Sequence, residues 1–326
     1  MKDLITDIKV LHEETLNNLK SSKANNTIRA YKSDFKDFGA FCAKNGFKSL
    51  PTEPKIISLY LTQLSMKDAK MSTLRRRLVS IGVIHKLKGL YLDTKHPIII
   101  ENLMGISRKK GNYQRGKKPI LINQLRAIID VIDKDRNYCG LDELSGNYKL
   151  IRDKTIILIG FAGGFRRAEL VSIDREDLEF VPEGVKIFIR KSKTDQFGEG
   201  MIKGLPYFSN QTYCPVLHLK EWIELSNIKS GAIFRKFNKG FSLSNNRLTD
   251  QSVALLLKYY LAKAGIENKN YSGHSLRSGF ATVSAESGAD ERSIMAMTGH
   301  KTTQMVRRYI KEANLFKNNA LNKIKI

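Results

Sequence analysis

Two histidines, an arginine and a tyrosine near the end of the sequence stand at offsets from which one chemical site can be built. His274 and Arg277 lie three residues apart, so they share a face if the segment is helical. His300 follows Gly299, and Tyr309 comes nine residues after His300. Arginine binds phosphate oxygens through paired N–H groups, and a phenol becomes a nucleophile where cationic groups favour its ionised form. Together these residue types point to nucleophilic attack on a phosphate ester.

His300 and Tyr309 can meet only if the chain breaks between them. On one continuous helix, an offset of nine residues places two side chains on opposite sides, at about 100° per residue. A turn at 298–300 and a new helix that begins near Thr302 or Thr303 would bring them together, because glycine ends helices and threonine caps them. We therefore expect Tyr309 to be carried by a separate helix.

An arginine that follows two glycines adds a second cation of the same kind. Residues 161–170 read Phe-Ala-Gly-Gly-Phe-Arg-Arg-Ala-Glu-Leu. The paired glycines break the preceding helix, and Arg166 at the start of the next helix can present its planar guanidinium to an anion. Glu169 lies three residues further on the same face and can orient Arg166. Taken alone, this pair is equally typical of a surface ion pair.

A predicted β-hairpin adds lysines. Alternating apolar residues from Val185 to Ile189 predict a strand, and residues 201–207 predict the return strand after a glycine-containing turn. Lys191 and Lys193 follow the first strand. There a lysine can protonate a leaving group, or it can simply protect the strand edge.

The charge of the chain indicates what the phosphate belongs to. Its 56 Lys and Arg residues oppose 32 Asp and Glu residues, and the net charge of +24 over 326 residues is typical of a nucleic-acid-binding protein. Contact with an anionic membrane is the alternative, although no apolar run is long enough to cross one. Three widely spaced cysteines and an N-terminus without targeting character favour a reducing, cytoplasmic setting. We find no cluster with metal-ligand spacing and expect neither a metal ion nor another cofactor.

The periodicities predict a mainly α protein with a small antiparallel β-sheet, of the α+β class. Four helical patterns fill the first hundred residues, so we expect a helical domain at 1–107, a basic linker at 108–118 and a larger second domain at 119–326. Basic residues on one helix of the first domain, in the linker and ahead of a helix near 250 are predicted DNA contacts, with an ordinary solvated surface as the alternative. They are Arg75, Arg76, Arg77, Lys109, Lys110, Arg115, Lys117, Lys118 and Arg247.

In this order and spacing, the motifs resemble the tyrosine recombinase (phage integrase) family, and most closely its compact Cre-like and Xer-like site-specific recombinases. The resemblance covers nearly the whole chain and rests on Gly-Gly-Phe-Arg166-Arg-Ala-Glu-Leu, Ser-Lys193-Thr, His274-Ser-Leu-Arg277, Gly-His300 and Tyr309. It implies a helical core-binding domain followed by a catalytic domain. It also implies that Tyr309 is the nucleophile and that Glu169 supports the catalytic residues. The implied catalytic residues are Arg166, Lys193, His274, Arg277, His300 and Tyr309.

The resemblance further implies the reaction and its partners. Such recombinases cleave and rejoin DNA strands through a 3′-phosphotyrosyl intermediate and a Holliday junction, as a tetramer on two sites and without a cofactor. The expected partners are double-stranded DNA with inverted-repeat recombination sites, further copies of the chain and accessory DNA-bending proteins, but no membrane. The expected setting is the cytoplasm, for a bacterial, phage or mobile-element protein.

Several alternatives stay open at this point. Arg167 stands where many family members carry an aliphatic residue, and the Arg-x-x-Glu-Leu register selects Arg166 instead. Lys191 competes with Lys193 for the role of general acid. A type IB topoisomerase shares the chemistry but only relaxes supercoils, and a catalytically inactive DNA-binding relative is the other alternative. Residues 315–324 predict an amphipathic helix that packs either on its own domain or on a neighbouring subunit.

Overall fold

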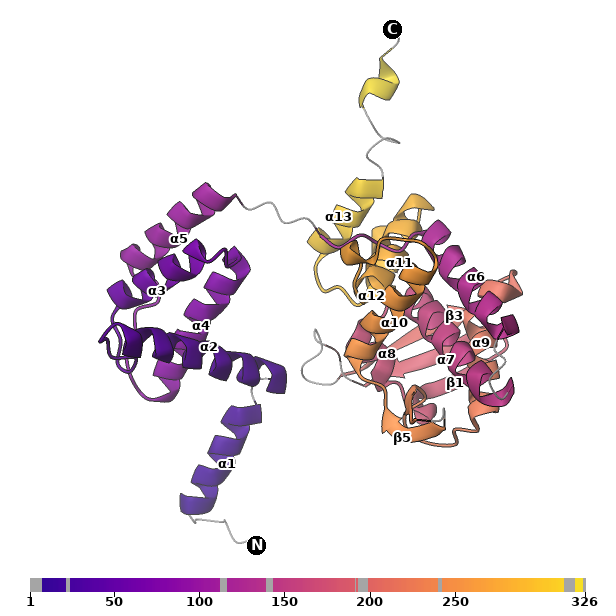
Figure 1. The fold of residues 1–326 in the computed structure, drawn as a ribbon, viewed down its shortest axis with the longest axis horizontal. Helices are drawn as coiled ribbons and strands as arrows, with labels where there is room; N and C mark the ends of the chain where they lie inside the picture. Colours follow the sequence, from indigo (N-terminus) through magenta and orange to yellow (C-terminus); the bar gives the residue numbers. More distant parts are fainter. Residues whose placement is uncertain are drawn as a thin grey trace, which may run out of the picture. The chain divides into compact units, whose positions relative to one another are not determined.

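The computed structural model describes residues 8–21, 24–111, 116–138, 143–190, 192, 199–239, 242–313 and 320–324. The chain divides into two compact units, Met1–Arg115 and Gly116–Ile326. The division falls inside the basic segment that the sequence assigns to a linker. The two units differ in architecture: the first is helical and the second combines helices with two small sheets (Figure 1).

The first unit consists of helices around one apolar core. α2 packs on α4 and α3 packs on α5, and the core between them includes Phe38, Tyr60, Leu61, Leu74 and Ile81. The helices are α1 (Ile8–Ser21), α2 (Asn25–Lys44), α3 (Pro54–Met66), α4 (Met71–Leu87) and α5 (Pro97–Lys110).

Helix α5 goes beyond the four helical patterns read from the sequence. Proline at its first turn and buried Ile99, Leu103 and Ile106 at offsets of four and three are the usual marks of a helix packed on one face. The helix continues through Lys110, so residues 108–110 are helical where the sequence suggested the start of a linker.

The second unit is built around α7. Residues 150–165, which comprise the second half of this helix and the turn after it, are buried. Helices α6, α9 and α11 pack against α7. The α-helices are α6 (Ile122–Tyr138), α7 (Glu143–Ala162), α8 (Arg167–Ser172), α9 (Pro215–Ser226), α10 (Asp250–Lys263), α11 (Ser275–Glu286), α12 (Glu291–Thr298) and α13 (Thr303–Ala313). Short 3-10 helices are η1 (Arg175–Asp177), η2 (Gln211–Tyr213), η3 (Asn268–Asn270) and η4 (Ala320–Lys323).

Two antiparallel sheets complete the second unit. One has the order β1-β2-β3, and the other pairs β4 with β5. β2 and β3 form the predicted hairpin, with Ile187 opposite Lys203, and the buried Val185, Ile187 and Ile189 confirm the predicted alternation. The strands are β1 (Leu178–Val181), β2 (Gly184–Ile189), β3 (Met201–Pro206), β4 (Arg235–Phe237) and β5 (Leu243–Arg247).

The structure describes only residues 320–324 of the predicted C-terminal amphipathic helix. Residues 320–323 form only the short 3-10 helix η4, and the apolar side chains of Leu321 and Ile324 are exposed. Residues 315 and 316 of the predicted apolar face lie outside the described residues. Whether this segment packs on its own unit or on a neighbouring subunit stays a prediction.

Candidate active site

The turn after α7 positions the first arginine. The helix ends at Ala162, and Gly164 adopts φ +53°, a left-handed conformation that glycine accepts without strain. Arg166 is the N-cap residue of α8: its backbone N–H donates to Glu169 Oε2 at 2.9 Å, and its Nη1 donates to Glu169 Oε1 at 2.5 Å. Because Glu169 is buried, its carboxylate fixes the direction in which the guanidinium of Arg166 points.

The second arginine comes from α11 and meets the same turn. Arg277 is only 1% exposed, and its Nη1 donates to the carbonyl oxygen of Gly164 at 2.9 Å. Within the described part of the chain, its Nε and Nη2 have no hydrogen-bond partner. Burial lowers the pKa of Arg277 to about 10, and the positive charge of Arg166 acts in the same direction. A buried cation with unsatisfied N–H groups is costly, and a bound anion would relieve that cost.

A glycine turn separates α12, which ends just before His300, from the helix that carries Tyr309, as their spacing predicts. α12 ends at Thr298, its C-cap residue Gly299 adopts φ +62°, and α13 begins at Thr303. The carbonyl of Gly299 accepts a 3.3 Å hydrogen bond from Nη2 of Arg166, so this turn reaches the first arginine. The break therefore places His300 directly beside a residue that contacts the guanidinium.

Hydrogen bonding fixes which nitrogen of His300 carries the proton. The hydroxyl of Thr298 donates its single proton to the carbonyl of Ile294 at 2.6 Å, so it accepts from His300 Nδ1 at 2.8 Å. In the neutral ring, Nε2 then carries no proton. Burial lowers the pKa of His300 to about 4, with the charges of Arg277 and Arg166 acting in the same direction.

His274 is the N-cap residue of α11, one turn before Arg277. Its side chain is exposed at the edge of the site, and partial desolvation and then the charge of Arg277 lower the pKa of His274. Both histidines are therefore neutral at pH 7. A neutral imidazole can accept a proton, which is what a base for a tyrosine hydroxyl needs.

Tyr309 is half-buried on α13. It packs against a small apolar cluster formed by α11, α12 and α13, which includes Ala281, Ile294 and Val306. The ionised form of Tyr309 would raise the pKa of Arg277, so the phenol lies within electrostatic reach of the buried guanidinium. α13, which carries Tyr309, thus packs on α11, the helix that carries Arg277.

The structure gathers five of the six predicted catalytic residues in one region of the second unit. They are Arg166, His274, Arg277, His300 and Tyr309. The sixth, Lys193, lies outside the described residues, as does its competitor Lys191. The identity of the general acid therefore remains a prediction.

Sequence reasoning missed one further cation in this region. Lys203 on β3 is 1% exposed, its Nζ donates to the carbonyl of Gly163 at 2.8 Å, and it lies 4.2 Å from the ring centroid of Phe165. Burial lowers the pKa of Lys203 to about 7; the charges of Arg277 and Arg166 add to this, while Glu169 opposes it. The signal was present in the sequence, because Lys203 has the inward parity of the return strand.

The predicted DNA-contacting arginines of α4 are not equivalent. Arg76 and Arg77 both form ion pairs with the buried Asp34, at 2.5 and 3.2 Å, and Arg77 also pairs with Asp37 at 3.1 Å. Arg75 is exposed, and no ion pair of it is found among the described residues. Two of the three arginines thus tie α4 to α2, and Arg75 is the one best placed for an external phosphate.

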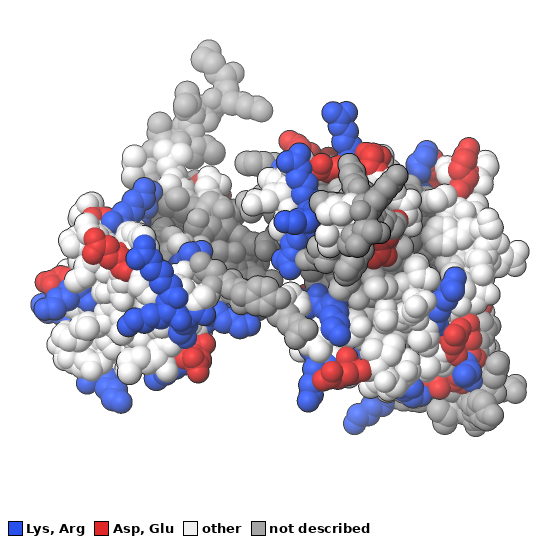
Figure 2. Space-filling view, turned by 90° about the horizontal axis from the view of Figure 1, so that it is seen from above, with Lys and Arg blue, Asp and Glu red and all other residues white. Residues whose placement is uncertain are grey.

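The basic residues around the division between the units are largely exposed. Lys109 and Lys118 face solvent, Lys110 forms a 3.5 Å ion pair within the first unit, and Lys117 donates to a backbone carbonyl of the second at 2.5 Å. Arg115 lies outside the described residues. Figure 2 shows Lys and Arg side chains forming a continuous group on the visible face of the first unit.

Arg247, the last predicted DNA contact, is engaged within its own unit. Its Nη2 pairs with Asp174 Oδ1 at 2.5 Å, and its Nη1 donates to the carbonyl of Val171 at 2.7 Å. These contacts hold β5 next to the end of α8. Arg247 therefore already has a structural role, whatever else it contacts.

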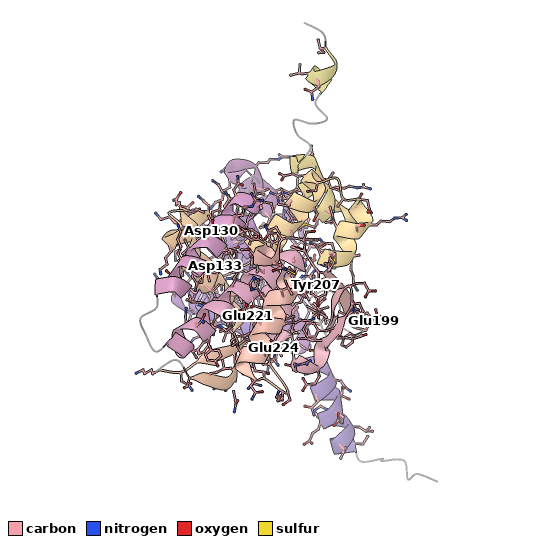
Figure 3. All side chains as sticks on the ribbon, turned by 90° about the vertical axis from the view of Figure 1, so that its right-hand side faces the viewer. Asp130, Asp133, Glu199, Tyr207, Glu221 and Glu224 are labelled. Atoms are coloured by element: carbon pink, nitrogen blue, oxygen red, sulfur yellow. The ribbon has the colours of Figure 1, made fainter. Side chains whose placement is uncertain are left out.

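Carboxylates of the second unit are spread over its surface. Figure 3 shows Asp130 and Asp133 on α6 and Glu221 and Glu224 on α9. Throughout the described ranges, no group of three or more His, Cys, Asp or Glu side chains is arranged to hold a metal ion. Across the same ranges, no helix is both long and apolar enough to cross a membrane.

Both the sequence and the fold of this chain are similar to those of known integrases and recombinases. The model of the phage integrase family matches residues 120–315. The integrase/recombinase xerD homolog of Selenomonas ruminantium is 42% identical over 309 residues, which cover 94% of this chain and 87% of that protein. Tyrosine recombinase XerD of Staphylococcus epidermidis is 27% identical over 304 residues, 90% of this chain and 92% of that one.

Solved structures share the fold at low sequence identity. The XerH site-specific recombinase, bound to palindromic difH substrate in a post-cleavage complex, aligns with a TM-score of 0.65 at 16% identity and covers 90% of this chain and 80% of its own. A lambda integrase dimer bound to a COC′ core site aligns with a TM-score of 0.58 at 13% identity, over 97% and 98% of the two chains. The matching family model and the 42% identical relative establish that this chain belongs to the phage integrase family of tyrosine recombinases.

Proposed function

We propose that the chain is a site-specific DNA recombinase that breaks and rejoins strands through a covalent bond between Tyr309 and a 3′-phosphate. One observation carries the proposal. The Gly163–Gly164 turn and the buried Glu169 hold two arginines, one of them with unsatisfied N–H groups, beside a histidine and a tyrosine helix. This is a site built to bind an oxyanion in contact with a nucleophile.

The arginines supply what the reaction needs most. Attack on a phosphodiester increases the negative charge on its non-bridging oxygens, and preorganised donors stabilise that charge in the transition state. Arg277 contributes buried N–H groups, and Arg166 contributes a guanidinium held by a carboxylate. Neither has to be desolvated or reoriented when the phosphate arrives.

The covalent step exchanges one phosphate ester for another. The phenol oxygen of Tyr309 bonds to phosphorus, its proton passes to His274, and the bond from phosphorus to the 5′-oxygen breaks. Lys193 protonates the departing 5′-oxygen, which becomes a hydroxyl. Because the phosphotyrosine conserves an ester bond, a 5′-hydroxyl from another strand can reverse the step without ATP.

We place the reaction on duplex DNA inside the cell. The net charge of +24 and the exposed basic residues of the first unit support wrapping of the DNA backbone. The solved relatives bound to difH substrate and to a COC′ core site support paired half-sites as the substrate. We propose that four copies act on two such inverted-repeat sites through a Holliday junction, with accessory DNA-bending proteins where direction has to be imposed.

Two assays on duplexes taken from the DNA that flanks the gene test this function. In the first, nicked duplexes are incubated with the protein and separated on a denaturing gel; a covalent adduct forms with wild type and with Tyr259→Phe, but not with Tyr309→Phe. In the second, plasmids with and without two copies of the reactive duplex are compared. Recombination that depends on both copies supports the proposal, whereas relaxation of either plasmid alone would indicate a type IB topoisomerase.

A further inference from the structure

We propose that Lys203 is a positioning residue for the phosphate-binding arginines, acting through the Gly163–Gly164 turn. The inference rests on the proposed function, because it assigns a role within the same site. Lys203 is carried by β3, and neither the glycine motif nor the histidine and tyrosine motifs contain it.

Two consecutive carbonyls of one turn are held by two cations. Lys203 Nζ donates to Gly163 O at 2.8 Å, and Arg277 Nη1 donates to Gly164 O at 2.9 Å. Arg166 follows two residues later and caps α8. The direction of these carbonyls therefore sets where Arg277 is anchored and where the segment that presents Arg166 begins.

The backbone of the turn tolerates little variation. A Cβ added to Gly163 would lie 2.1 Å from the ring of Phe165, and one added to Gly164 would lie 2.9 Å from Phe280 in addition to its unfavourable φ of +53°. Such a tight turn has no side chain of its own with which to fix its carbonyls. Lys203, from strand β3, fixes the Gly163 carbonyl by its hydrogen bond. Its ammonium group also lies 4.2 Å from the centroid of the Phe165 ring, a cation–π distance.

Core packing alone does not account for a lysine at this position. Lys203 lies opposite Ile187 and shares its inward parity with the buried Leu205. Within the described ranges, no carboxylate lies within ion-pair distance of its Nζ. An aliphatic side chain would fill the same space without the cost of burying an ammonium group, so stability is not what the lysine provides.

The position of Lys203 also links two parts of the reaction. β3 is the second strand of the β2–β3 hairpin. In the sequence, the expected general acid, Lys193, lies between these two strands. Through Lys203, this hairpin is bonded to the same turn that anchors Arg277. The titratable groups facing Lys203 are Arg166 and Glu169 at the start of α8, Arg277 from α11 and the neutral His300 after α12. When it is protonated, Lys203 adds to the positive potential of the site.

The test separates a positioning role from proton transfer. Reactive duplexes are prepared with a normal ester and with sulfur in place of the bridging 5′-oxygen, because a thiolate leaves without being protonated. We expect Lys203→Met to bind both duplexes as tightly as wild type and to form adduct about 10- to 100-fold more slowly on both. The matched control Lys186→Met, on the exposed face of β2, cleaves at the wild-type rate.

Three results would overturn the inference. Adduct formation by Lys203→Met at the wild-type rate removes any role, and rescue by the sulfur duplex makes Lys203 the general acid. Lys203→Arg, which keeps charge and donors, must cleave faster than Lys203→Gln. The opposite order contradicts a positioning role even if Lys203→Met does not fold. If wild type itself forms no adduct on any duplex, the proposed function fails and this inference falls with it.

Discussion

At the scale of single residues, the site is defined by a buried arginine, Arg277, that has unsatisfied N–H groups. Arg277 is 1% exposed with two N–H-bearing atoms unsatisfied within the described residues, and the buried carboxylate of Glu169 is paired with Arg166. Burial of these charged groups costs free energy, because they would be more stable in water, and the rest of the fold offsets that cost. This is what makes the site ready for phosphate before DNA arrives.

Replacing Arg277 by alanine should separate binding from cleavage. DNA affinity depends on many phosphate contacts, so we expect it to change little, whereas loss of a preorganised donor should slow adduct formation about 10²- to 10³-fold. Gel-shift titration and single-turnover cleavage on the same duplex measure the two quantities. Arg292→Ala, at an exposed position on α12, is the control and should alter neither. Equal losses of affinity and rate in Arg277→Ala would refute the phosphate-clamp role.

Lys203 predicts a rise in stability with pH. Its pKa is about 7 in the folded protein and 10.5 without burial, so between these values the unfolded chain binds one more proton than the folded one. The free energy of unfolding then increases with pH, by at most about 1.4 kcal/mol per unit. Ionisation of tyrosines has the opposite effect only from about pH 10 upward, because burial raises the pKa of Tyr260.

Urea unfolding between pH 7 and about pH 9.5 measures this slope. Trp222, the one tryptophan of the sequence, is buried in the second unit and reports its unfolding by fluorescence. We expect a clear slope in wild type and a much flatter one in Lys203→Met. Identical slopes in the two proteins would mean that Lys203 stays protonated in the fold.

At the scale of elements, the site depends on two glycine turns. Gly164 lies between α7 and α8, and Gly299 lies between α12 and α13; both adopt positive φ. The first turn offers its carbonyls to Lys203 and Arg277, and the second offers its carbonyl to Arg166. The turns thus connect five helices (α7, α8, α11, α12 and α13) and strand β3 at the place where the cations meet.

Gly299→Ala should impair cleavage through this turn. The left-handed φ of +62° disfavours alanine by about 1 kcal/mol, and the new Cβ would lie 3.3 Å from Met201 Sδ. We expect a modest loss of thermal stability and slower adduct formation, because the carbonyl bonded to Arg166 shifts. Gly288→Ala is matched to it, since Gly288 has φ +86° and open space around it. Equal effects of both substitutions on cleavage would show that strain alone is responsible.

Much of this arrangement could be predicted from sequence, because it follows from local rules. The nine-residue offset between His300 and Tyr309 required a break, and the alternation from Val185 to Ile189 required a strand. Four-residue β1 was not predicted, because so short a segment is a strand only through its pairing with β2. Lys203 was missed for a similar reason: its partner, the Gly163 carbonyl, is 40 residues away in sequence.

At the scale of the whole molecule, charge has two different uses. On α4, Arg76 and Arg77 are paired with Asp34 and Asp37 of α2, whereas Arg75 is exposed and has no ion pair among the described residues. The sequence alone does not distinguish these three neighbouring arginines, because their difference in pairing depends on Asp34, which lies on another helix. The net charge therefore overstates how many cations are available to DNA.

We expect Arg75→Ala and Arg77→Ala to act on different quantities. Arg75→Ala should weaken DNA binding and reduce the slope of log affinity against log salt by about one, with stability unchanged. Arg77→Ala leaves the buried Asp34 short of a partner and should lower the free energy of unfolding by about 1–3 kcal/mol. Salt-dependent binding and urea unfolding check the pair. A reduced salt slope in Arg77→Ala with normal stability would reverse these assignments.

The central claim is that the chain forms a covalent bond to DNA through one side chain, Tyr309. Mass spectrometry of the protein trapped on a reactive duplex with a bridging 5′-sulfur tests it most directly. After digestion with protease and nuclease, we predict a nucleotide attached to the peptide that contains Tyr309, and no modified peptide from Tyr309→Phe. A nucleotide on any other residue, or an adduct that persists in Tyr309→Phe, would contradict the account.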